Sequence, residues 1–360
     1  MSTPHVEPAL AEFYGSLPEF TLERLVGQAS SRVYWRLSAA GADPGTLIVM
    51  QLPDDAFASD EGGDGPPPTE LPFLSVGRLL DERGVRVPKV HAVDLPNRVI
   101  LLEDLGDETF EDRLKARPGA TDALYGVAVD RLAAMHAACD DLPADSLPET
   151  GRFDRALLRW EMDHFREWGL EELGGALTDG QRERFDGSAD ALVDQILAAP
   201  QGFTHRDYQS RNLMWKGDEL VLIDFQDALQ GPRPYDLVAL LCDSYVDLGE
   251  PLQLAMIERY GRARGFDATE QQAFTTTFWR VAVQRKLKDA GRFVYIDRVR
   301  GNSDFLPAFG QSLGYVGRAL RQLGSELAEL RTLLEGRIDG FPDQVATPPA
   351  NTGSAPDRTY

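Results

Sequence analysis

The sequence predicts an α+β protein with two lobes, a small N-terminal lobe built on antiparallel strands and a larger, mainly helical C-terminal lobe. At 360 residues the chain exceeds the usual size of a single domain. Short β-rich segments fill residues 22–102, and after them come segments with apolar residues at three- and four-residue spacing. We therefore place an N-terminal lobe at residues 1–102, a hinge at residues 103–107 and a helical lobe at residues 108–340.

The N-terminal lobe begins with a predicted β-hairpin. Residues 32–37 and 46–50 are rich in β-branched, aromatic and aliphatic side chains, and the Gly, Asp and Pro residues of 41–45 form a turn between them. Residues 53–72 are dense in Gly, Pro and Asp, so we expect a mobile loop there. The lobe is completed by one helix and two strands, placed at residues 73–83, 85–90 and 98–102.

The C-terminal lobe is predicted to be helical, with one short hairpin. Residues 212–215 and 219–224 are mostly apolar and flank a turn at residues 216–218. The tail, residues 341–360, has few apolar side chains, and we expect it to be disordered. The predicted helices cover residues 122–139, 153–168, 179–197, 235–248, 269–291 and 313–334.

Composition narrows the classes of partner. A formal net charge of −21 repels polyanions, so neither nucleic acid nor an anionic membrane is expected as the main partner. The two cysteines, Cys139 and Cys242, belong to no close Cys/His cluster, which argues against a disulfide framework or a zinc site. The first 20 residues lack the basic start and apolar run of a signal peptide, and no segment approaches the roughly 20 apolar residues that span a bilayer. We expect a cytoplasmic protein.

The strongest chemical pattern lies around Asp207. His205 precedes this aspartate by two positions, Asn212 follows it by five, and a hairpin then ends in Asp224. Transfer of a phosphoryl group needs a carboxylate beside the attacking hydroxyl and oxygen ligands for magnesium. In this interpretation Asp207 has the first role, and Asn212 and Asp224 have the second.

Each of these residues has an ordinary structural alternative when it is taken alone. His205 and Asn212 fit hydrogen-bonded turn positions, and the two aspartates fit helix caps or turns. The combination is more specific, because one loop and the hairpin after it supply a base and two metal ligands at a fixed spacing.

This pattern resembles the catalytic and metal-binding loops of the aminoglycoside/choline phosphotransferase branch of the protein-kinase-like fold, with Arg206 where glycine is usual. A closer resemblance covers most of residues 20–325. It is to the bacterial kinases of cell-wall recycling that phosphorylate the anomeric hydroxyl of N-acetylmuramate and N-acetylglucosamine. The resemblance implies a small β-sheet lobe, a larger helical lobe and a reaction that uses ATP and Mg²⁺. It rests on the strings at residues 72–74, 101–107, 205–208, 210–214, 224–228 and 231–237.

The resemblance also implies roles for individual residues. Asp207 is implied to be the catalytic base, Asn212 and Asp224 the ligands of Mg²⁺, and Asp236 a structural brace of the catalytic loop. The nucleotide is implied to lie under a phosphate loop and against the backbone of the hinge. These segments contain Gly27, Gln28, Ala29, Ser30, Ser31, Arg32, Glu103, Asp104 and Leu105. For the phosphate loop, an ordinary turn of small residues is the alternative.

One kinase feature is missing from the sequence. Met50 and Gln51 stand where typical kinases carry a strand lysine that contacts the phosphates, and the helix at residues 73–83 has no interior glutamate to pair with one. The sugar kinases that the chain resembles also lack this lysine. Arg32 or Arg36 supplies the positive charge in our interpretation, and the sequence does not rank the two against each other or against a role as strand-edge arginines.

The acceptor side of the site is less clear from the sequence. Two groups of residues suit sugar or carboxylate binding, but our default interpretation is helix packing for the first group and a solvated helix face for the second. The first group is Trp160, Glu161, His164, Arg166 and Trp168, and the second is Arg285, Lys286, Lys288 and Arg292.

The predicted function is ATP-dependent phosphorylation of a small-molecule acceptor, an amino sugar in our first interpretation. The alternative within this class is another small alcohol, such as an aminoglycoside or a choline-like or homoserine-like compound. The alternative from another class is a nucleotide-binding pseudokinase or scaffold, which the missing lysine suggests. The sequence leaves open the choice between ATP and GTP and the oligomeric state.

Overall fold

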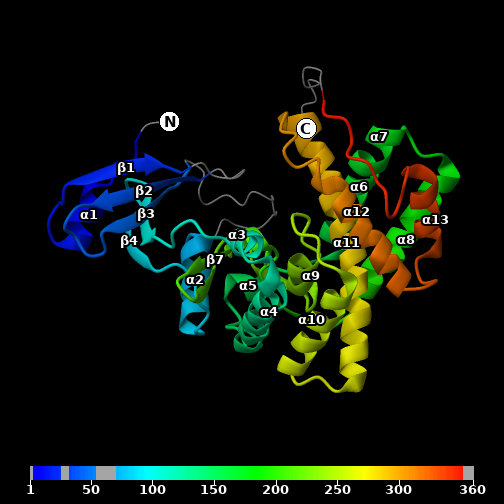
Figure 1. The fold of residues 1–360 in the computed structure, drawn as a ribbon, viewed down its shortest axis with the longest axis horizontal. Coiled ribbons are helices and arrows are strands. Elements are labelled where there is room, and N and C mark those ends of the chain that lie inside the picture. Colours follow the sequence, from blue (N-terminus) through cyan, green and yellow to red (C-terminus); the bar gives the residue numbers. More distant parts are fainter. Residues whose placement is uncertain (1–2, 26–31, 54–69, 352–360) are drawn as a thin grey trace. The chain divides into compact units, whose positions relative to one another are not determined.

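The computed structural model describes residues 3–25, 32–53 and 70–351. The chain divides into two compact units (Figure 1). The first unit consists of Met1–Phe110 with Leu213–Gln226, and the second of Glu111–Asn212 with Asp227–Tyr360. The first unit holds a five-stranded antiparallel sheet and the second is mainly helical, so the predicted α+β class is confirmed.

The sheet of the first unit has the strand order β1-β2-β3-β5-β4. The predicted hairpin is confirmed, because β2 and β3 pair antiparallel with Val33 opposite Gln51. β1 pairs with the other edge of β2 and was not predicted as a separate strand. The strands are β1 (Phe20–Arg24), β2 (Val33–Ala39), β3 (Thr46–Gln51), β4 (Val90–Asp94) and β5 (Val99–Glu103).

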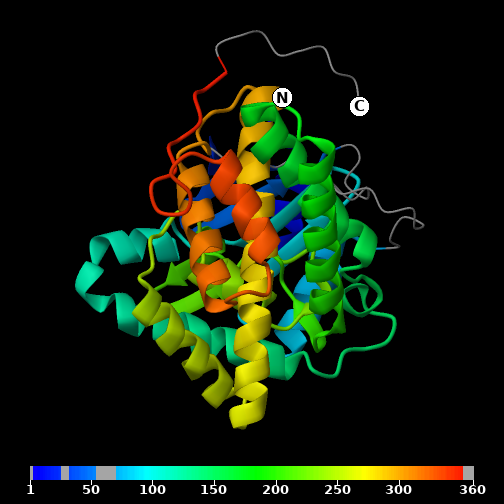
Figure 2. The ribbon, with the colours of Figure 1, turned by 90° about the vertical axis from the view of Figure 1, so that its right-hand side faces the viewer.

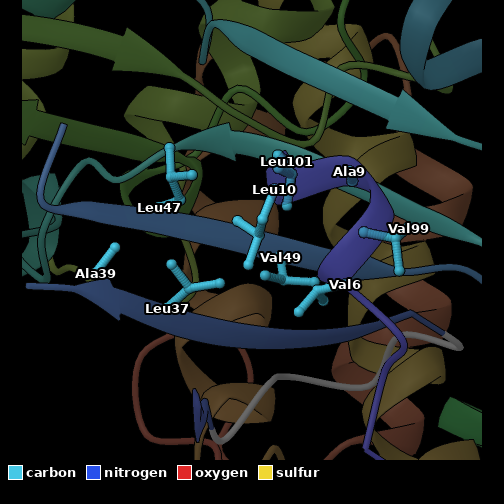
Figure 3. Packing of buried hydrophobic residues seen from close by; sticks show 9 residues of the cluster. All are labelled: Val6, Ala9, Leu10, Leu37, Ala39, Leu47, Val49, Val99 and Leu101. Carbon is cyan, nitrogen blue, oxygen red and sulfur yellow. The ribbon is translucent and has the colours of Figure 1, made fainter. Parts of the chain in front are cut away.

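A short N-terminal helix, α1 (Glu7–Tyr14), covers one face of this sheet. Figure 3 shows Val6, Ala9 and Leu10 of this region packed against apolar side chains of β2, β3 and β5. All of these residues are almost fully buried, so Val6, Ala9 and Leu10 form part of the core. α1 was not predicted, because a helix of only 8 residues is too short to show a clear apolar periodicity.

One predicted strand is wrong. We placed a strand at residues 85–90, but β4 begins only at Val90 and residues 85–89 have no regular secondary structure. Pro88 has no backbone N–H and so cannot donate to a sheet ladder, which explains why the strand starts after it. The backbone of this segment instead bonds to the hairpin at residues 213–222, because the Arg86 carbonyl accepts a hydrogen bond of 2.9 Å from the Leu222 amide.

The hairpin of β7 (Leu213–Lys216) and β8 (Glu219–Leu222) belongs to the first unit, although the sequence places it among the helices. Besides the bond to Arg86, the Trp215 amide donates 2.8 Å to the Glu108 carbonyl. Met214 also forms an isolated bridge with Thr109. Gly217 turns the hairpin with φ +62°, a conformation that glycine adopts without steric cost. The helix α2 (Pro72–Glu82) completes the unit, near the predicted residues 73–83.

The second unit contains most of the helices of the described residues (Figures 1 and 2). Most predicted helices are found, with different ends. α9 stops early at Leu241, and α11 continues nine residues past the predicted end at residue 291, to Arg300. The single helix predicted at residues 313–334 is two helices, because Gly324 has φ +64° and interrupts it. The helices named below are α3 (Phe110–Ala116), α4 (Thr121–Ala138), α6 (Arg155–Phe165), α8 (Asp179–Ala198), α9 (Tyr235–Leu241), α10 (Glu250–Ala263), α11 (Ala268–Arg300), α12 (Ala308–Gln322) and α13 (Ala328–Arg337).

Residues 341–351 differ from the disordered tail that the sequence predicts. The Asn351 amide donates to Asp297 at 3.0 Å, and Arg298 donates to the Pro349 carbonyl at 3.0 Å. Glycines of α12 allow the close approach, since a Cβ on Gly317 would lie 2.0 Å from Pro342. The polar composition of the tail therefore did not exclude packing against a helix surface of small residues. No helix in the described ranges is both long and apolar enough to cross a membrane.

Candidate active site

The loop that carries Asp207 lies in the second unit, directly after β6 (Gln201–Thr204). Its backbone is fixed by Asp236, a fully buried residue in the first turn of α9. The Asp236 carboxylate accepts hydrogen bonds from the amides of His205 at 2.7 Å and Arg206 at 2.9 Å. The prediction that Asp236 braces the loop from a helix start is confirmed.

Arg206 has a left-handed backbone with φ +78°. This conformation costs a residue with a side chain about 1–2 kcal/mol, whereas glycine adopts it freely. The geometry explains why glycine is usual here in the loops that this one resembles. In this chain the two hydrogen bonds to Asp236 hold the strained turn in place, and the Arg206 guanidinium lies 5.5 Å from the centre of the Phe153 ring.

Asp207 projects from this turn with its side chain 44% exposed. Arg285 of α11 donates to its carboxylate at 3.1 Å and also to the Arg206 carbonyl at 2.7 Å. Burial raises the pKa of Asp207, but the charges of Arg285, Lys288 and Arg206 outweigh this effect and hold the pKa below its ordinary value. Asp207 is therefore an ionised, oriented carboxylate at neutral pH, with part of its surface open to an incoming hydroxyl.

Asn212 closes the same loop. Its side-chain nitrogen donates to the Asp207 carbonyl at 2.9 Å. Because the nitrogen of the amide is engaged in this way, the oxygen is the atom that is suited to a cation. Behind it, Asp243 accepts hydrogen bonds from the amide of Ser210 at 2.9 Å and from its hydroxyl at 2.5 Å. Asp243 is a loop brace that the sequence analysis missed.

Asp224 belongs to the first unit, two residues after β8. It has φ +65°, again in the left-handed region, and accepts a hydrogen bond of 2.9 Å from Gln226. The following residue, Phe225, is buried and stacks on Phe73 of α2 with 5.1 Å between ring centres. A Cβ on Gly77 would lie 3.1 Å from the Phe225 ring, so the glycine allows the ring to approach α2 closely. Phe225 thus anchors the turn that presents Asp224.

The residues predicted to hold a metal fit the chemistry of a hard cation. Magnesium prefers carboxylate and amide oxygens and retains several ligands from water or phosphate. Asn212 in the second unit and Asp224 in the first each carry an oxygen of this kind. Among the described side chains, no group of three or more His, Cys, Asp or Glu is arranged to hold a metal by itself. Each of the two residues by itself would leave most of the coordination of a cation to other oxygen ligands.

The hinge residues lie in the first unit, and the side chain of Glu103 is engaged within that unit. Glu103 accepts hydrogen bonds from Arg86 at 2.6 Å and from Lys216 at 2.8 Å. Burial raises the pKa of Glu103, but hydrogen bonds from these two cations and from the Lys89 amide outweigh burial. The net effect lowers the pKa of Glu103 from 4.5 to about 2. Because the carboxylate is satisfied internally, any contact of this segment with a nucleotide would use its backbone.

The two candidate arginines of β2 and the turn before it have different surroundings. Arg36 donates to Asp104 at 3.0 Å and to Asp107 at 2.8 Å, so it braces the hinge. Arg32 lies near Tyr34. The pKa of Tyr34 is raised, and burial is the largest cause. The charge of Asp224 raises this pKa further, and Arg32 opposes it. Arg32 and Asp224 therefore both act on the same side chain of the first unit, Tyr34.

The lysine position itself is occupied by an apolar residue and an amide. Met50 is fully buried within β3, and Gln51 ends the strand. The Gln51 side-chain oxygen is buried and has no hydrogen-bond partner within residues 3–25, 32–53 and 70–351. The phosphate loop predicted at Gly27, Gln28, Ala29, Ser30 and Ser31 lies outside the described residues, as does most of the loop predicted at 53–72.

The basic segment of α11 is not a solvated helix face, and our default interpretation of it is wrong. Arg285 and Lys286 are only 3% and 2% exposed. Arg285 faces the catalytic loop, and Lys286 donates to Asp289 at 2.7 Å. Burial of these cations is possible because each one has an anionic partner. The local excess of Lys and Arg in an acidic chain was the available signal, but sequence alone did not reveal which face of the helix carries it.

The aromatic group on α6 and just after it is partly core and partly surface. Glu161, His164 and Trp168 are buried, as our packing interpretation predicts, whereas Trp160 is 52% exposed. Trp160 stacks on His164 with 5.4 Å between ring centres, and Tyr295 of α11 meets His164 edge-on at 5.3 Å. The group therefore presents one open aromatic surface beside α11.

Comparison with known proteins connects this geometry to a family. The model of the phosphotransferase enzyme family, APH, matches residues 21–274. A curated relative from Pseudomonas aeruginosa, named N-acetylmuramate/N-acetylglucosamine kinase, is 35% identical over 338 residues. The match covers 92% of this chain and 93% of the relative.

Solved structures with little sequence similarity share the fold. A choline/ethanolamine kinase family protein from Mesorhizobium loti superposes with a TM-score of 0.55 at 16% identity, covering 87% of this chain and 92% of that one. An amicoumacin kinase in complex with AMP-PNP and Ca²⁺ gives a TM-score of 0.54 at 12% identity, covering 86% and 88%. The protein-kinase-like fold that the sequence predicts is therefore confirmed.

Proposed function

The chain belongs to the phosphotransferase enzyme family, APH, and on that premise we propose that it transfers the γ-phosphoryl group of ATP to the anomeric hydroxyl of N-acetylmuramate or N-acetylglucosamine. The acceptor is inferred from the name of the curated relative, which is similar to this chain over more than nine-tenths of both lengths. The single observation that carries the proposal is the state of Asp207, a carboxylate that is ionised, oriented by Arg285 and still accessible.

In the proposed reaction Asp207 accepts a hydrogen bond from the acceptor hydroxyl and takes its proton as the oxygen attacks phosphorus. A bond forms between the sugar oxygen and the γ-phosphorus, the bond from that phosphorus to the bridging oxygen breaks, and ADP leaves. A carboxylate held at a low pKa is a weak base, so its main contribution is to orient the hydroxyl until the proton is released late in the transfer.

The remaining residues position the nucleotide. Asn212 and Asp224 would hold Mg²⁺, which would neutralise charge on the phosphates. The backbone of Glu103, Asp104 and Leu105 would meet the adenine, and Arg32 would contact the phosphates. AMP-PNP and Ca²⁺ bound to the amicoumacin kinase support a nucleotide and a divalent cation as the ligands of this fold. The choice of magnesium and ATP is part of our proposal.

The proposal is tested with purified protein, ATP and MgCl₂ against a panel of N-acetylmuramate, N-acetylglucosamine, an aminoglycoside and choline. Phosphorus NMR identifies the product, because a phosphate on C1 couples to the anomeric proton. We expect a sugar 1-phosphate from the two amino sugars and none from Asp207→Ala. Asp130→Ala is a matched control, since Asp130 is half exposed and pairs with Arg259 on a helix surface of the same unit.

Phosphorylation of choline or the aminoglycoside in preference to the sugars would overturn the proposed acceptor. ATP binding without turnover of any acceptor would favour the nucleotide-binding scaffold instead.

A further inference from the structure

Three cations lie on one face of α11, at Arg285, Lys288 and Arg292. The spacing of three and four residues places them on the same side of the helix, over a distance of about 10 Å along its axis. Arg285 is occupied by the catalytic loop, through its bonds to the Arg206 carbonyl and the Asp207 carboxylate. The stripe of charge therefore begins at the catalytic aspartate and leads away from it.

Lys288 is more accessible and has longer ion pairs than its neighbours Arg285 and Lys286. Its amino group lies 3.3 Å from Asp289 and 4.0 Å from Glu161. Both carboxylates have a closer donor, because Lys286 reaches Asp289 at 2.7 Å and Gln284 reaches Glu161 at 2.6 Å. The Lys288 side chain is also 21% exposed, compared with 3% for Lys286 and 4% for Arg285. Of Arg285, Lys286 and Lys288, Lys288 is therefore the most accessible to an anion from solvent, and its ion pair is the longest.

Lys288 follows the Asp207-bound Arg285 by three residues on the same face of α11, and its amino group lies 4.0 Å from Glu161 of α6. Its charge is among those that lower the pKa of Asp207. Burial lowers the pKa of His164 to about 4, and the charges of Arg292 and Lys288 contribute to this shift. His164 is therefore neutral at pH 7, and its Nε2 is buried with no hydrogen-bond partner in the part of the chain that is described.

This arrangement has the features of a site for an acidic sugar. Exposed Trp160, stacked on His164, offers an aromatic face of the kind that packs against a sugar ring. Lys288 offers a cation beside the same helix, because its amino group lies 4.0 Å from Glu161 of α6. A local cation stripe of this kind needs an explanation in a chain of net charge −21.

We propose that Lys288 binds the carboxylate of an acidic amino-sugar acceptor and so determines how strongly the site prefers N-acetylmuramate to N-acetylglucosamine. This inference rests on the proposed function. The two sugars differ in one group, because N-acetylmuramate carries a lactyl ether whose carboxylate the neutral sugar lacks. A cation on the helix face that also carries the Asp207-bound Arg285 distinguishes them while both present the same anomeric hydroxyl.

The test measures KM and kcat for three acceptors at saturating ATP: N-acetylmuramate, its methyl ester and N-acetylglucosamine. Lys288→Met removes the charge and retains the aliphatic stem that packs beside Glu161. We expect this variant to raise KM for N-acetylmuramate about 10- to 100-fold, the usual range for one hydrogen bond to a charged group. KM for the ester and for N-acetylglucosamine should change less than about 3-fold, because neither ligand has a carboxylate for Lys288 to bind.

Two further comparisons show whether the charge is the cause. In the wild type, replacing N-acetylmuramate by its methyl ester should raise KM. Lys288→Met should raise KM for N-acetylmuramate by the same factor. The variant should then have equal KM values for the acid and the ester. Lys288→Arg should restore most of the preference for the acid. Lys115→Met is the control, because Lys115 lies on α3 of the same unit, is 67% exposed and pairs with Glu111.

An equal loss on all three acceptors would assign Lys288 a purely structural or general catalytic role and would overturn the proposal. An unchanged preference in Lys288→Met, or equal KM values for acid and ester in the wild type, would also overturn it. Retained turnover of N-acetylglucosamine shows that a variant is folded. If the wild type phosphorylates neither sugar, the proposed function itself has failed, and this outcome is distinct from a change in the preference between the sugars.

Discussion

Asp236 holds the catalytic loop in a strained conformation, and its removal is predicted to affect both stability and activity. The carboxylate is fully buried and accepts three hydrogen bonds, from the amides of His205 and Arg206 and from His136 Nε2 at 3.0 Å. Asp236→Ala leaves these buried donors without an acceptor.

The magnitude follows from these contacts. Each buried donor left without an acceptor costs about 1–3 kcal/mol, and removal of one partner from a buried polar network costs about 3–5 kcal/mol. Water that enters the space left by the carboxylate recovers part of this, so we expect a loss of about 3–5 kcal/mol in the free energy of unfolding. Release of the brace also frees Arg206 from φ +78°, which relieves about 1–2 kcal/mol of strain and displaces Asp207.

The free energy of unfolding is measured by urea denaturation, and kcat is measured at a temperature where the variant remains folded. We expect kcat to fall even there, because Asp207 no longer has its position. The double variant Asp236→Ala with Arg206→Gly should recover kcat about 5- to 30-fold over Asp236→Ala, because glycine adopts the required φ without strain. Asp130→Ala is the control and should cost no more than about 1 kcal/mol, as an exposed ion pair does.

Two results would refute this reasoning. One is a stability loss for Asp236→Ala as small as that for Asp130→Ala. The other is a double variant whose kcat is no better than that of the single variant, which would mean that backbone strain at Arg206 does not control the position of Asp207.

Three other changes have defined outcomes. Gly77→Val should lower the free energy of unfolding by about 1–3 kcal/mol, because the valine side chain meets the Phe225 ring. The control Gly180→Ala, on an open face of α8, should leave the thermal midpoint unchanged or raise it. Equal shifts for the two variants would contradict the packing of Gly77 against Phe225. Because Glu103 has its pKa lowered from 4.5 to about 2, its contribution to stability is present above pH 4.5 and is lost as the pH falls through about 2. Glu103→Gln should therefore flatten the acid limb of stability in that window, and an unchanged limb would be contrary evidence. Arg32→Met should raise KM for ATP about 10-fold. Arg36→Met should change the stability of the hinge more than KM, because Arg36 pairs with Asp104 and Asp107. A larger rise in KM for Arg36→Met than for Arg32→Met would assign the phosphate contact to Arg36.

The parts of the fold that sequence reasoning predicted are those with a strong local signal. The β2–β3 hairpin combines β-rich runs with a Gly- and Pro-containing turn, and it forms as expected. The long helices α4 and α8 have apolar faces and lie within a residue or two of their predicted ends. α1 and α10 were missed, since one is short and the other has a weak apolar pattern, and tertiary packing stabilises both.

The candidate site shows the same division between local and long-range information. Asp207, Asn212 and Asp224 stand in one continuous motif, so the sequence identified them as a set. Arg285 reaches Asp207 from 78 residues away, and Asp243 reaches Ser210 from 33 residues away. Such partners depend on how helices pack, and one sequence carries no direct signal for that. Composition did show that residues 285–292 were unusually basic, but burial decided what the charge does.

The central claim is that the Asp207 carboxylate orients and deprotonates the acceptor hydroxyl. Single-turnover transfer from ATP to N-acetylmuramate, compared between wild type and Asp207→Asn with ATP binding measured on the same samples, tests it most directly. The claim predicts a rate about 10²- to 10⁴-fold lower in the variant with ATP affinity unchanged. A variant that transfers the phosphoryl group within about 3-fold of the wild-type rate would contradict it, because removal of a general base costs at least about 10²-fold.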